Sequence, residues 1–458
     1  MNEVAVQPIE LGKWGRIMLV LIIGYFLMGR SFAYLGIPPW HVFIGEVALA
    51  VFLFGGPETV RGSWVRLVPR IKNLRVLVKI YLLFLIYGIF QVYHGVAQGY
   101  SLLTALRDLA FNYYPLFFLV GLWVGLQSPN SLPHMFRILA WFNGIYGIAY
   151  ILFLNRVTWT FPGVSDQVAD VPIFGPPEYS FVILLALLIY EPNLKRIWHL
   201  LALNAFVMLG MQVRGEWLGL AAGLFFWGVL TKRVKRMLAG AGVVGLLLVL
   251  MFLVNFRIPG PESRGGSDIS AQDLVGRALA PVNSDLAADY TSSYKMDVGT
   301  AVWRTIWWAA IWQEVNGSRR TALFGFGYGY PIGELSPLIE LGEFIRTPHN
   351  AFFYALGYTG WIGVLLFAAF LAEMARLVWR SGRKAGQPGG IVLLAAMLTY
   401  AMFTAFFEAP YGAIPFYLLA GYLVGSGFEQ RSAELSYSAA GAPAVPTQPD
   451  CTTEGQNN

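Results

Sequence analysis

Two arginines in the sequence stand at positions where a charged side chain is costly. Arg214 lies in a short turn between two apolar blocks, and Arg304 lies inside a stretch rich in tryptophan. Arginines at such a depth are usually paired or functional. Arg214 either clamps an anion such as a phosphate group or pairs with Glu216 and extends to the membrane surface. Arg304 either contacts lipid headgroups or holds a pyrophosphate group.

The surroundings of Arg304 predict a helix. At 100° per residue, one helical face carries Trp303, Arg304, Trp307, Trp308 and Ile311. Several tryptophans on one face are typical of an amphipathic helix that lies in the membrane interface. We therefore expect an interfacial helix whose apolar stripe contains the arginine.

His349 is the histidine with the most informative neighbours. Thr347 and Pro348 precede it and suit the N-cap and N1 positions of the apolar helix that follows. The sequence then predicts His349 in the first turn, where the helix dipole favours a neutral imidazole. A neutral imidazole can take a proton from a hydroxyl group or bind a phosphate. The alternative is a structural histidine that caps a loop.

A glycine-rich segment, defined here as residues 325–329, precedes His349 and contains Gly325, Gly327 and Gly329. The segment is not the Gly-x-Gly-x-x-Gly fingerprint of dinucleotide-binding proteins. The last glycine of that pattern is missing, and so is the strand–loop–helix unit that would surround it. It predicts a tight turn that allows backbone to approach a ligand. Its aromatic residues either stack on sugar faces or pack in the core, and the glutamates that follow are candidate carboxylates: Glu334, Glu340 and Glu343.

Other kinds of chemistry have no support in the sequence. We find no metal-ligand spacing, P-loop or serine-hydrolase elbow, so we expect no metal and no cofactor. The single cysteine, Cys451, excludes an internal disulfide and a cysteine-based zinc site.

The composition predicts an all-α polytopic membrane protein. Of 458 residues, 56% are hydrophobic and 13% are charged, whereas soluble proteins carry about 25% charged residues. Many apolar blocks are long enough to cross a bilayer as helices. We predict about twelve spans, at roughly 15–29, 40–55, 76–96, 113–127, 136–154, 178–190, 197–212, 215–230, 237–256, 350–373, 390–407 and 412–428.

Basic residues predict the orientation of these spans. Lysines and arginines concentrate in alternate connections, which places both termini in the cytoplasm. The net charge is +6, but the basic residues are dispersed among the apolar spans, so the charge gives no indication of nucleic-acid binding. Four regions follow: an N-terminal bundle of about nine helices (1–256), a large periplasmic loop that carries the interfacial helix (257–348), about three C-terminal helices (349–428) and a disordered cytoplasmic tail (429–458).

Taken in order, these features resemble the O-antigen ligase and O-antigen polymerase superfamily of bacterial envelope glycosyltransferases. The shared pattern runs through Arg214-Gly215, Arg304 with Trp307 and Trp308, the glycine-rich segment, and Pro348-His349-Asn350. A Gly-x-x-Gly pattern follows at Gly360 and Gly363. The likeness covers roughly residues 155–370.

The resemblance implies a multi-pass protein of the bacterial inner membrane with its active site facing the periplasm. It implies transfer of a glycan from undecaprenyl pyrophosphate to an acceptor hydroxyl on lipid A-core or on a second lipid-linked repeat, by an inverting reaction that needs no metal. The expected catalytic residues are His349, Arg214 and Arg304. The expected substrate-binding residues are Gly325, Gly327, Gly329, Asn350 and Trp308.

Two other functions stay open at this point. One is a transporter or flippase of lipid-linked oligosaccharides, which would place its charged residues along a central cavity between related halves. The other is a non-catalytic subunit of a polysaccharide export complex. The enzyme hypothesis requires that the two guanidinium groups and the imidazole converge at the outer end of the helical bundle.

Overall fold

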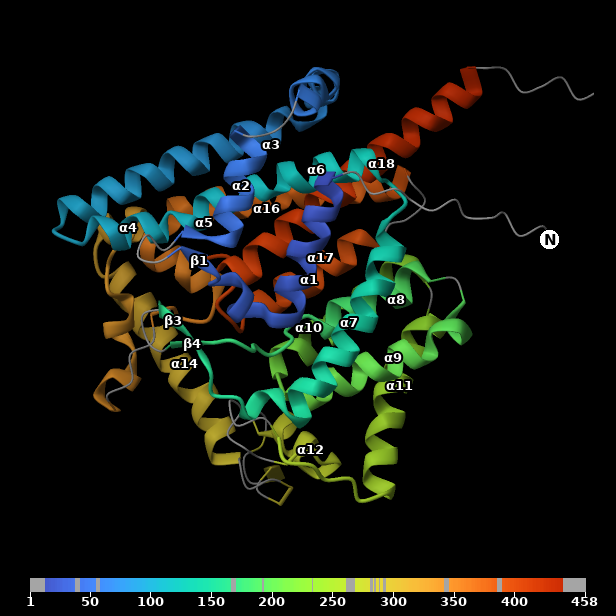
Figure 1. Cartoon of the computed structure of the whole chain (residues 1–458). Coiled ribbons are helices and arrows are strands. Elements are labelled where there is room, and N and C mark those ends of the chain that lie inside the picture. The colour runs from blue at the N-terminus through green and yellow to red at the C-terminus, as the bar shows by residue number, and fades with distance from the viewer. Residues whose placement is uncertain are drawn as a thin grey trace, which may run out of the picture.

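A computed structural model of the chain describes residues 13–37, 42–54, 58–165, 170–191, 193–232, 234–260, 268–280, 283, 286–287, 289–290, 294–341, 346–384 and 389–439. Helices dominate these residues (Figure 1). Two short antiparallel hairpins are the exception to the predicted all-α architecture. They pair β1 (Gly36–Ile37) with β2 (Val42–Phe43) and β3 (Thr160–Ser165) with β4 (Asp170–Pro172).

The chain before the large loop forms most of the helices. Their bounds are α1 (Lys13–Ala33), α2 (Ile44–Phe54), α3 (Glu58–Ala97), α4 (Leu102–Asp108), α5 (Ala110–Tyr113), η1 (Tyr114–Leu116), α6 (Phe117–Gln127), α7 (Leu132–Leu152), η2 (Leu154–Arg156), α8 (Ser180–Tyr190), α9 (Leu194–Met211), α10 (Arg214–Thr231) and α11 (Val234–Leu253). The large loop and the C-terminal part contain α12 (Ala271–Leu279), α14 (Tyr294–Asn316), α15 (Arg319–Phe324), η4 (Ile332–Leu335), η5 (Pro337–Leu341), α16 (Ala351–Lys384), α17 (Gly390–Ala401) and α18 (Pro410–Ala439).

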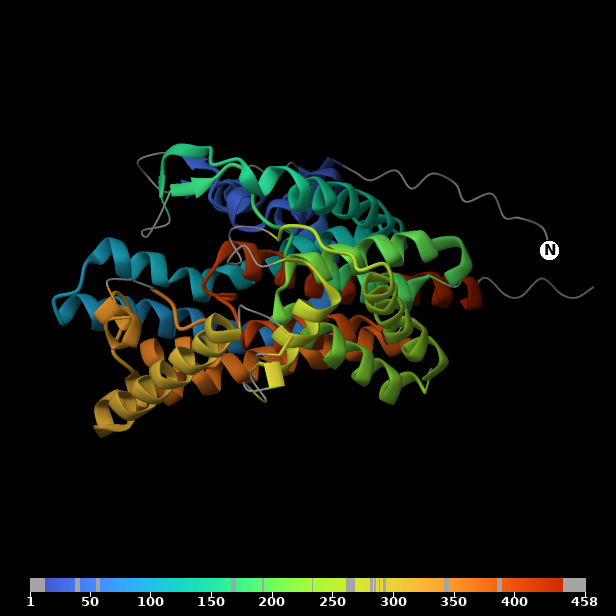
Figure 2. The ribbon, with the colours of Figure 1, turned by 90° about the horizontal axis from the view of Figure 1, so that it is seen from below.

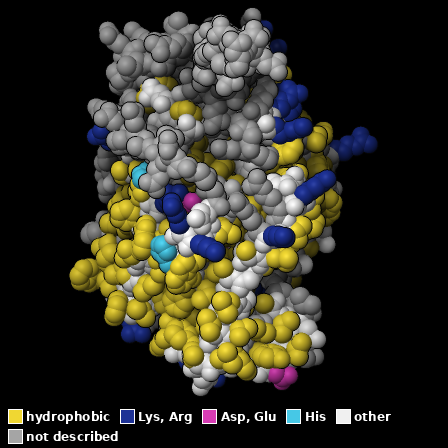
Figure 3. Space-filling model, turned by 90° about the vertical axis from the view of Figure 1, so that its right-hand side faces the viewer, with side chains coloured by type: hydrophobic (Ala, Val, Ile, Leu, Met, Phe, Trp, Pro, Cys, Tyr) yellow, Lys and Arg dark blue, Asp and Glu magenta, His cyan; other side chains and the backbone are white. Residues whose placement is uncertain are grey.

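The helices fit a membrane protein. Among the described residues, five segments are long and apolar enough to cross a bilayer: Arg16–Ala33, Leu74–Ala97, Leu102–Gln127, Leu132–Leu152 and Ala351–Arg383. Shorter apolar helices accompany them, and each of the twelve predicted spans overlaps a helix. Apolar side chains also cover much of the described surface in Figure 3, as expected where a protein meets lipid rather than water.

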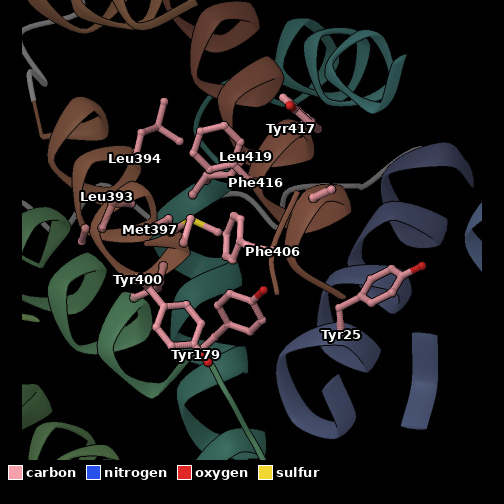
Figure 4. Packing of buried hydrophobic residues seen from close by; sticks show 14 of the residues in the cluster. Tyr25, Tyr179, Leu393, Leu394, Met397, Tyr400, Phe406, Phe416, Tyr417 and Leu419 are labelled. Atoms are coloured by element: carbon pink, nitrogen blue, oxygen red, sulfur yellow. The ribbon is translucent and has the colours of Figure 1, made fainter. Parts of the chain in front are cut away.

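The N-terminal and C-terminal helices pack together in one core. Helices α6 and α18 meet through glycines four residues apart, because Gly121 and Gly125 face Gly421 and Gly425. A Cβ atom on Gly121 would lie 2.0 Å from the carbonyl oxygen of Leu418, so the two backbones are in contact. Aromatic side chains fill the adjoining core, as Figure 4 shows around Tyr179, Tyr400 and Phe406.

Helix α14 is the tryptophan-rich helix predicted in the large loop, and it packs against α16 (Figures 1 and 2). Trp307 and Ile311 on the predicted apolar stripe are fully buried, and the indole N–H of Trp307 donates to the carbonyl of Ile332 at 3.1 Å. The stripe therefore contacts protein, and among the large apolar side chains of α14 that the structure describes, the exposed ones are Val302, Ile306 and Trp312.

The C-terminal segment differs from the prediction. Helix α18 continues to Ala439, into the region from residue 429 that the sequence predicts to be disordered. The rest of that predicted tail, residues 440–458, lies outside the described residues.

Candidate functional site

A polar pocket of about 360 Å³ collects charged residues from distant parts of the chain. Its charged lining residues come from α1, α2 and α4, from the segment before α16, and from the α17–α18 loop, defined here as residues 402–409. Parts of β2, α5, η1, α16 and α18 complete the lining. Its ionisable lining residues, apart from tyrosines, are Arg30, Glu46, Arg107, Asp108, Arg346, His349 and Glu408. We call this space the polar pocket.

His349 lies at the edge of α16 but outside it. The helix begins at Ala351, and Asn350 is its cap, because the side-chain oxygen of Asn350 accepts from the backbone N–H groups of Phe352 and Phe353 at 2.9 and 3.1 Å. The prediction that Thr347 caps the helix and that His349 belongs to its first turn is therefore wrong. His349 instead has a left-handed backbone, with φ of 53°, which is uncommon for a residue other than glycine.

The imidazole of His349 is held in one orientation. Its Nδ1 lies 2.8 Å from the carbonyl oxygen of Thr347, so Nδ1 carries a proton and donates it there. This leaves Nε2 as an acceptor. Burial lowers the pKa of His349 to about 4, and the charge of Arg304 acts in the same direction. The ring is therefore neutral at physiological pH.

Helix α14 supports the turn that carries His349. The indole N–H of Trp308 donates to the carbonyl of Pro348 at 2.7 Å, and the ring of Trp303 lies edge-to-face with the imidazole at 6.0 Å between centroids. The guanidinium of Arg304 stands 5.4 Å above the ring of Trp303. Arg304 and His349 are thus near each other, and both contact the ring of Trp303.

The α17–α18 loop connects these residues to Arg214. The guanidinium of Arg304 donates to the carbonyl of Phe403 at 3.3 Å, and the amide of Asn350 donates to the carbonyl of Met402 at 3.0 Å. Arg214 begins α10, and a Cβ atom on the next residue, Gly215, would lie 3.6 Å from Cβ of Phe403. Arg214 is therefore beside the same loop, but it is not among the residues that line the polar pocket.

Asp108 and Arg346 form a buried ion pair in the polar pocket. Asp108 also accepts from the backbone N–H of Gly329 at 2.9 Å, and its side chain is only 3% exposed. Burial disfavours the charged guanidinium, but the carboxylate of Asp108 outweighs this effect and raises the pKa of Arg346. Asp108 therefore holds the charged guanidinium of Arg346 in place, three residues before His349.

The glycine-rich segment serves this arrangement through backbone contacts. All three of its glycines have positive φ values, between 71° and 90°. The backbone N–H of Phe326 donates to the carbonyl of Gly357 in α16, and that of Tyr328 donates to the carbonyl of Gln91 in α3. The segment thus joins α3 to α16 and presents Gly329 to Asp108, and none of its glycines is among the residues that line the polar pocket.

Glu408 adds a second titrating group to the polar pocket. One oxygen of its carboxylate accepts from the backbone N–H of Phe406 at 3.1 Å. Burial raises the pKa of Glu408 to about 7, despite the backbone hydrogen bonds that favour the charged form. Within the part of the chain that the structure describes, no three His, Cys, Asp or Glu side chains are grouped as metal ligands.

Several of these residues are absent from the sequence-based prediction: Arg30, Arg107, Asp108, Arg346 and Glu408. Two signals were available. Arg346 stands three residues before His349, and the charged pair Arg107-Asp108 interrupts an apolar region, where an unpaired charge is costly.

Comparison with known proteins supports one family. No curated protein matches the chain. The sequence pattern of the O-antigen ligase family matches residues 199–368, which contain Arg214, Arg304, the glycine-rich segment and His349. This match supports the resemblance to the O-antigen ligase and polymerase superfamily of membrane glycosyltransferases, and residues 199–368 are the part of the chain that carries the family pattern.

Proposed function

We propose that the protein transfers a glycan from undecaprenyl pyrophosphate to an acceptor hydroxyl at the periplasmic face of the bacterial inner membrane. The acceptor is lipid A-core for a ligase or a second lipid-linked repeat for a polymerase. The observation that carries the proposal is the polar pocket, which combines three arginines with a neutral histidine.

The arginines suit a pyrophosphate leaving group. Arg30, Arg107 and Arg346 line one pocket, and a guanidinium can form paired hydrogen bonds with phosphate oxygens. Negative charge grows on the pyrophosphate as the bond to the sugar breaks, so fixed positive charges stabilise the transition state more than the ground state. In this proposal arginines provide the neutralisation that a metal ion provides elsewhere.

His349 suits the acceptor hydroxyl. The hydroxyl oxygen attacks the anomeric carbon, its proton passes to Nε2 of His349, and the bond to the pyrophosphate oxygen breaks with its electron pair. One displacement of this kind inverts the anomeric centre. Arg304 acts on the same step, because its charge helps to keep the imidazole unprotonated. Arg214, across the α17–α18 loop, remains a catalytic candidate.

The predicted topology supports a periplasmic site. If the twelve helices cross the membrane in turn from a cytoplasmic N-terminus, Arg30, Arg107, Arg346, His349 and Glu408 all fall at outer ends of spans. A transporter needs such charges along a path across the bilayer. Their collection at one side favours an enzyme over a transporter.

Purified protein in proteoliposomes tests the proposal, with a lipid-pyrophosphate glycan as donor and release of undecaprenyl pyrophosphate as the readout. We expect His349→Ala, Arg107→Ala and Arg346→Ala each to lower kcat/KM by roughly 10²–10³. Arg319→Ala, at an exposed position of α15, is the matched control and should retain full turnover. Including Arg214→Ala and Arg304→Ala tests the two arginines predicted from the sequence. Equal turnover of the pocket variants and the control would refute the assignment.

A further inference from the structure

A second cavity, of about 310 Å³, lies among α2, α3, α6 and α16 and is lined by apolar and aromatic side chains. We call it the apolar cavity. Its size is at the lower end of the range for small-molecule pockets. Representative lining residues are Phe52, Leu77, Tyr81, Leu119, Trp123 and Phe370.

The apolar cavity and the polar pocket are lined by neighbouring residues on two chain segments. Tyr113 and Tyr114 line the polar pocket, and the next two residues, Pro115 and Leu116, line the apolar cavity. Along α2 the same change occurs between Glu46, in the polar pocket, and Phe52, in the apolar cavity. The two cavities therefore lie near each other, and together they match the chemistry of a ligand with a charged head and an apolar tail.

The apolar cavity also has an exposed rim on α3. Val78 and Leu82 line the cavity and are 38% and 48% exposed. They belong to Leu74–Ala97, one of the segments long and apolar enough to cross a membrane. In a bilayer this rim faces lipid, so the hydrocarbon chain of a membrane lipid can enter the cavity from the side. Helix α3 is at the top left of Figure 1.

We propose that the apolar cavity binds the isoprenoid units next to the pyrophosphate while the three arginines of the polar pocket hold the pyrophosphate itself. The inference rests on the proposed function and adds the site for the donor's tail. The chemistry of the two spaces selects the occupant. A polyanionic head complements the three arginines of the polar pocket, and an apolar tail suits the apolar cavity. The membrane interior is itself apolar, so the cavity gains its selectivity from shape and packing rather than from the hydrophobic effect.

Photo-crosslinking tests the site without requiring turnover. The full-length protein is placed in vesicles of phosphatidylethanolamine and phosphatidylglycerol with a polyprenyl pyrophosphate that carries a diazirine near its head. We expect labelled peptides from residues 74–82 and 115–123, and competition by unlabelled polyprenyl pyrophosphate. Labelling elsewhere would overturn the proposal. So would labelling of these peptides that excess phosphatidylglycerol removes equally well, because the cavity would then hold ordinary membrane lipid.

Filling the cavity provides a second test. Leu119→Trp occupies space inside the apolar cavity, and Leu83→Trp adds the same side chain at a position of α3 that is 57% exposed and outside the cavity. We expect native protein and Leu83→Trp to have a KM about tenfold lower for a long-chain donor than for a ten-carbon donor with the same head. Leu119→Trp should lose most of this preference while its kcat with the short donor stays unchanged.

The two tests separate this inference from the proposed function. An unaltered chain-length preference in a folded Leu119→Trp protein contradicts the tail site even when transfer proceeds. Absence of transfer by native protein contradicts the proposed function, and the crosslinking result still decides the tail site. Crosslinking of the native chain also decides it when Leu119→Trp does not fold.

Discussion

The protonation of His349 is the property of the site that can be measured most directly. Burial and the charge of Arg304 lower its pKa to about 4, from an ordinary value of 6.5. We therefore predict that His349 stays neutral as the pH falls from 7 to 5, a range over which an ordinary histidine becomes charged.

The size of the effect follows from this shift. A change from 6.5 to about 4 corresponds to roughly 3 kcal/mol between the two protonation states. At pH 5 about a tenth of His349 would be protonated, compared with about 97% of an unperturbed imidazole. Above pH 6.5 the neutral ring has no effect on the pH dependence of stability. Between pH 6.5 and 4 the unfolded chain binds a proton that the folded chain does not, so His349 makes stability fall with decreasing pH over this window.

NMR of protein labelled with ¹³C at histidine Cε1 measures the pKa directly. His349→Gln identifies the resonance, and His199→Gln, outside the polar pocket, is the matched control for the substitution. We expect the His349 resonance to titrate near pH 4. A midpoint between 6 and 7 would refute the burial and charge argument. Because Glu408 has a pKa of about 7, activity profiles should be compared with those of Glu408→Gln before any limb is assigned to His349.

Three further predictions concern other residues of the site and of the helix that follows it. Arg346→Gln removes a guanidinium from the polar pocket and should weaken binding of inorganic pyrophosphate by about 1.5–3 kcal/mol, measured by calorimetry; unchanged affinity would contradict the role of Arg346 in binding the leaving group. Arg304→Gln removes a positive charge near His349 and should raise its pKa in the same NMR titration; an unchanged or lower value would contradict the electrostatic link. Gly360→Ala places a Cβ atom at a residue with φ of 61° and should cost more than about 1–2 kcal/mol of stability, visible as a lower melting temperature. Gly242→Ala, where nothing lies within 4 Å of the added Cβ, is its control, and equal melting temperatures would contradict the strain argument.

The sequence was sufficient to predict the long apolar helices, and it singled out Arg304 and His349, which the structure places near each other. Long apolar blocks and alternating basic connections are local properties, and every predicted span overlaps a helix. The approach of Arg304 to His349 was also predictable in outline, because each residue stands beside aromatic or helix-starting residues that restrict its position. The helix start itself was misassigned, since Asn350 competes with Thr347 as a cap and only the folded chain shows which side chain reaches the free N–H groups.

The set of residues that line the polar pocket could not be predicted from the sequence. Arg30 follows a kink at Gly29, where φ is 44° and ψ is −115°, and this break turns the last part of α1. Arg107 and Asp108 stand between α3 and α6, and they join His349 through tertiary packing alone. Periodicity describes one element at a time, so it cannot show which ends of distant helices meet.

The low pKa of His349 has a consequence for the proposed reaction. The Nδ1–H of His349 donates to a backbone carbonyl rather than to a carboxylate, so this hydrogen bond stabilises the protonated ring less. The charges of Arg304 and Arg30 oppose protonation further. Such a base is weak before the donor binds. A bound pyrophosphate reverses this field, because its negative charge neutralises the arginines and favours the imidazolium. We therefore expect inorganic pyrophosphate to raise the pKa of His349 in the NMR titration, so that the base becomes effective when the leaving group is in place. A pKa that pyrophosphate leaves at about 4 would mean that His349 orients the acceptor without taking its proton.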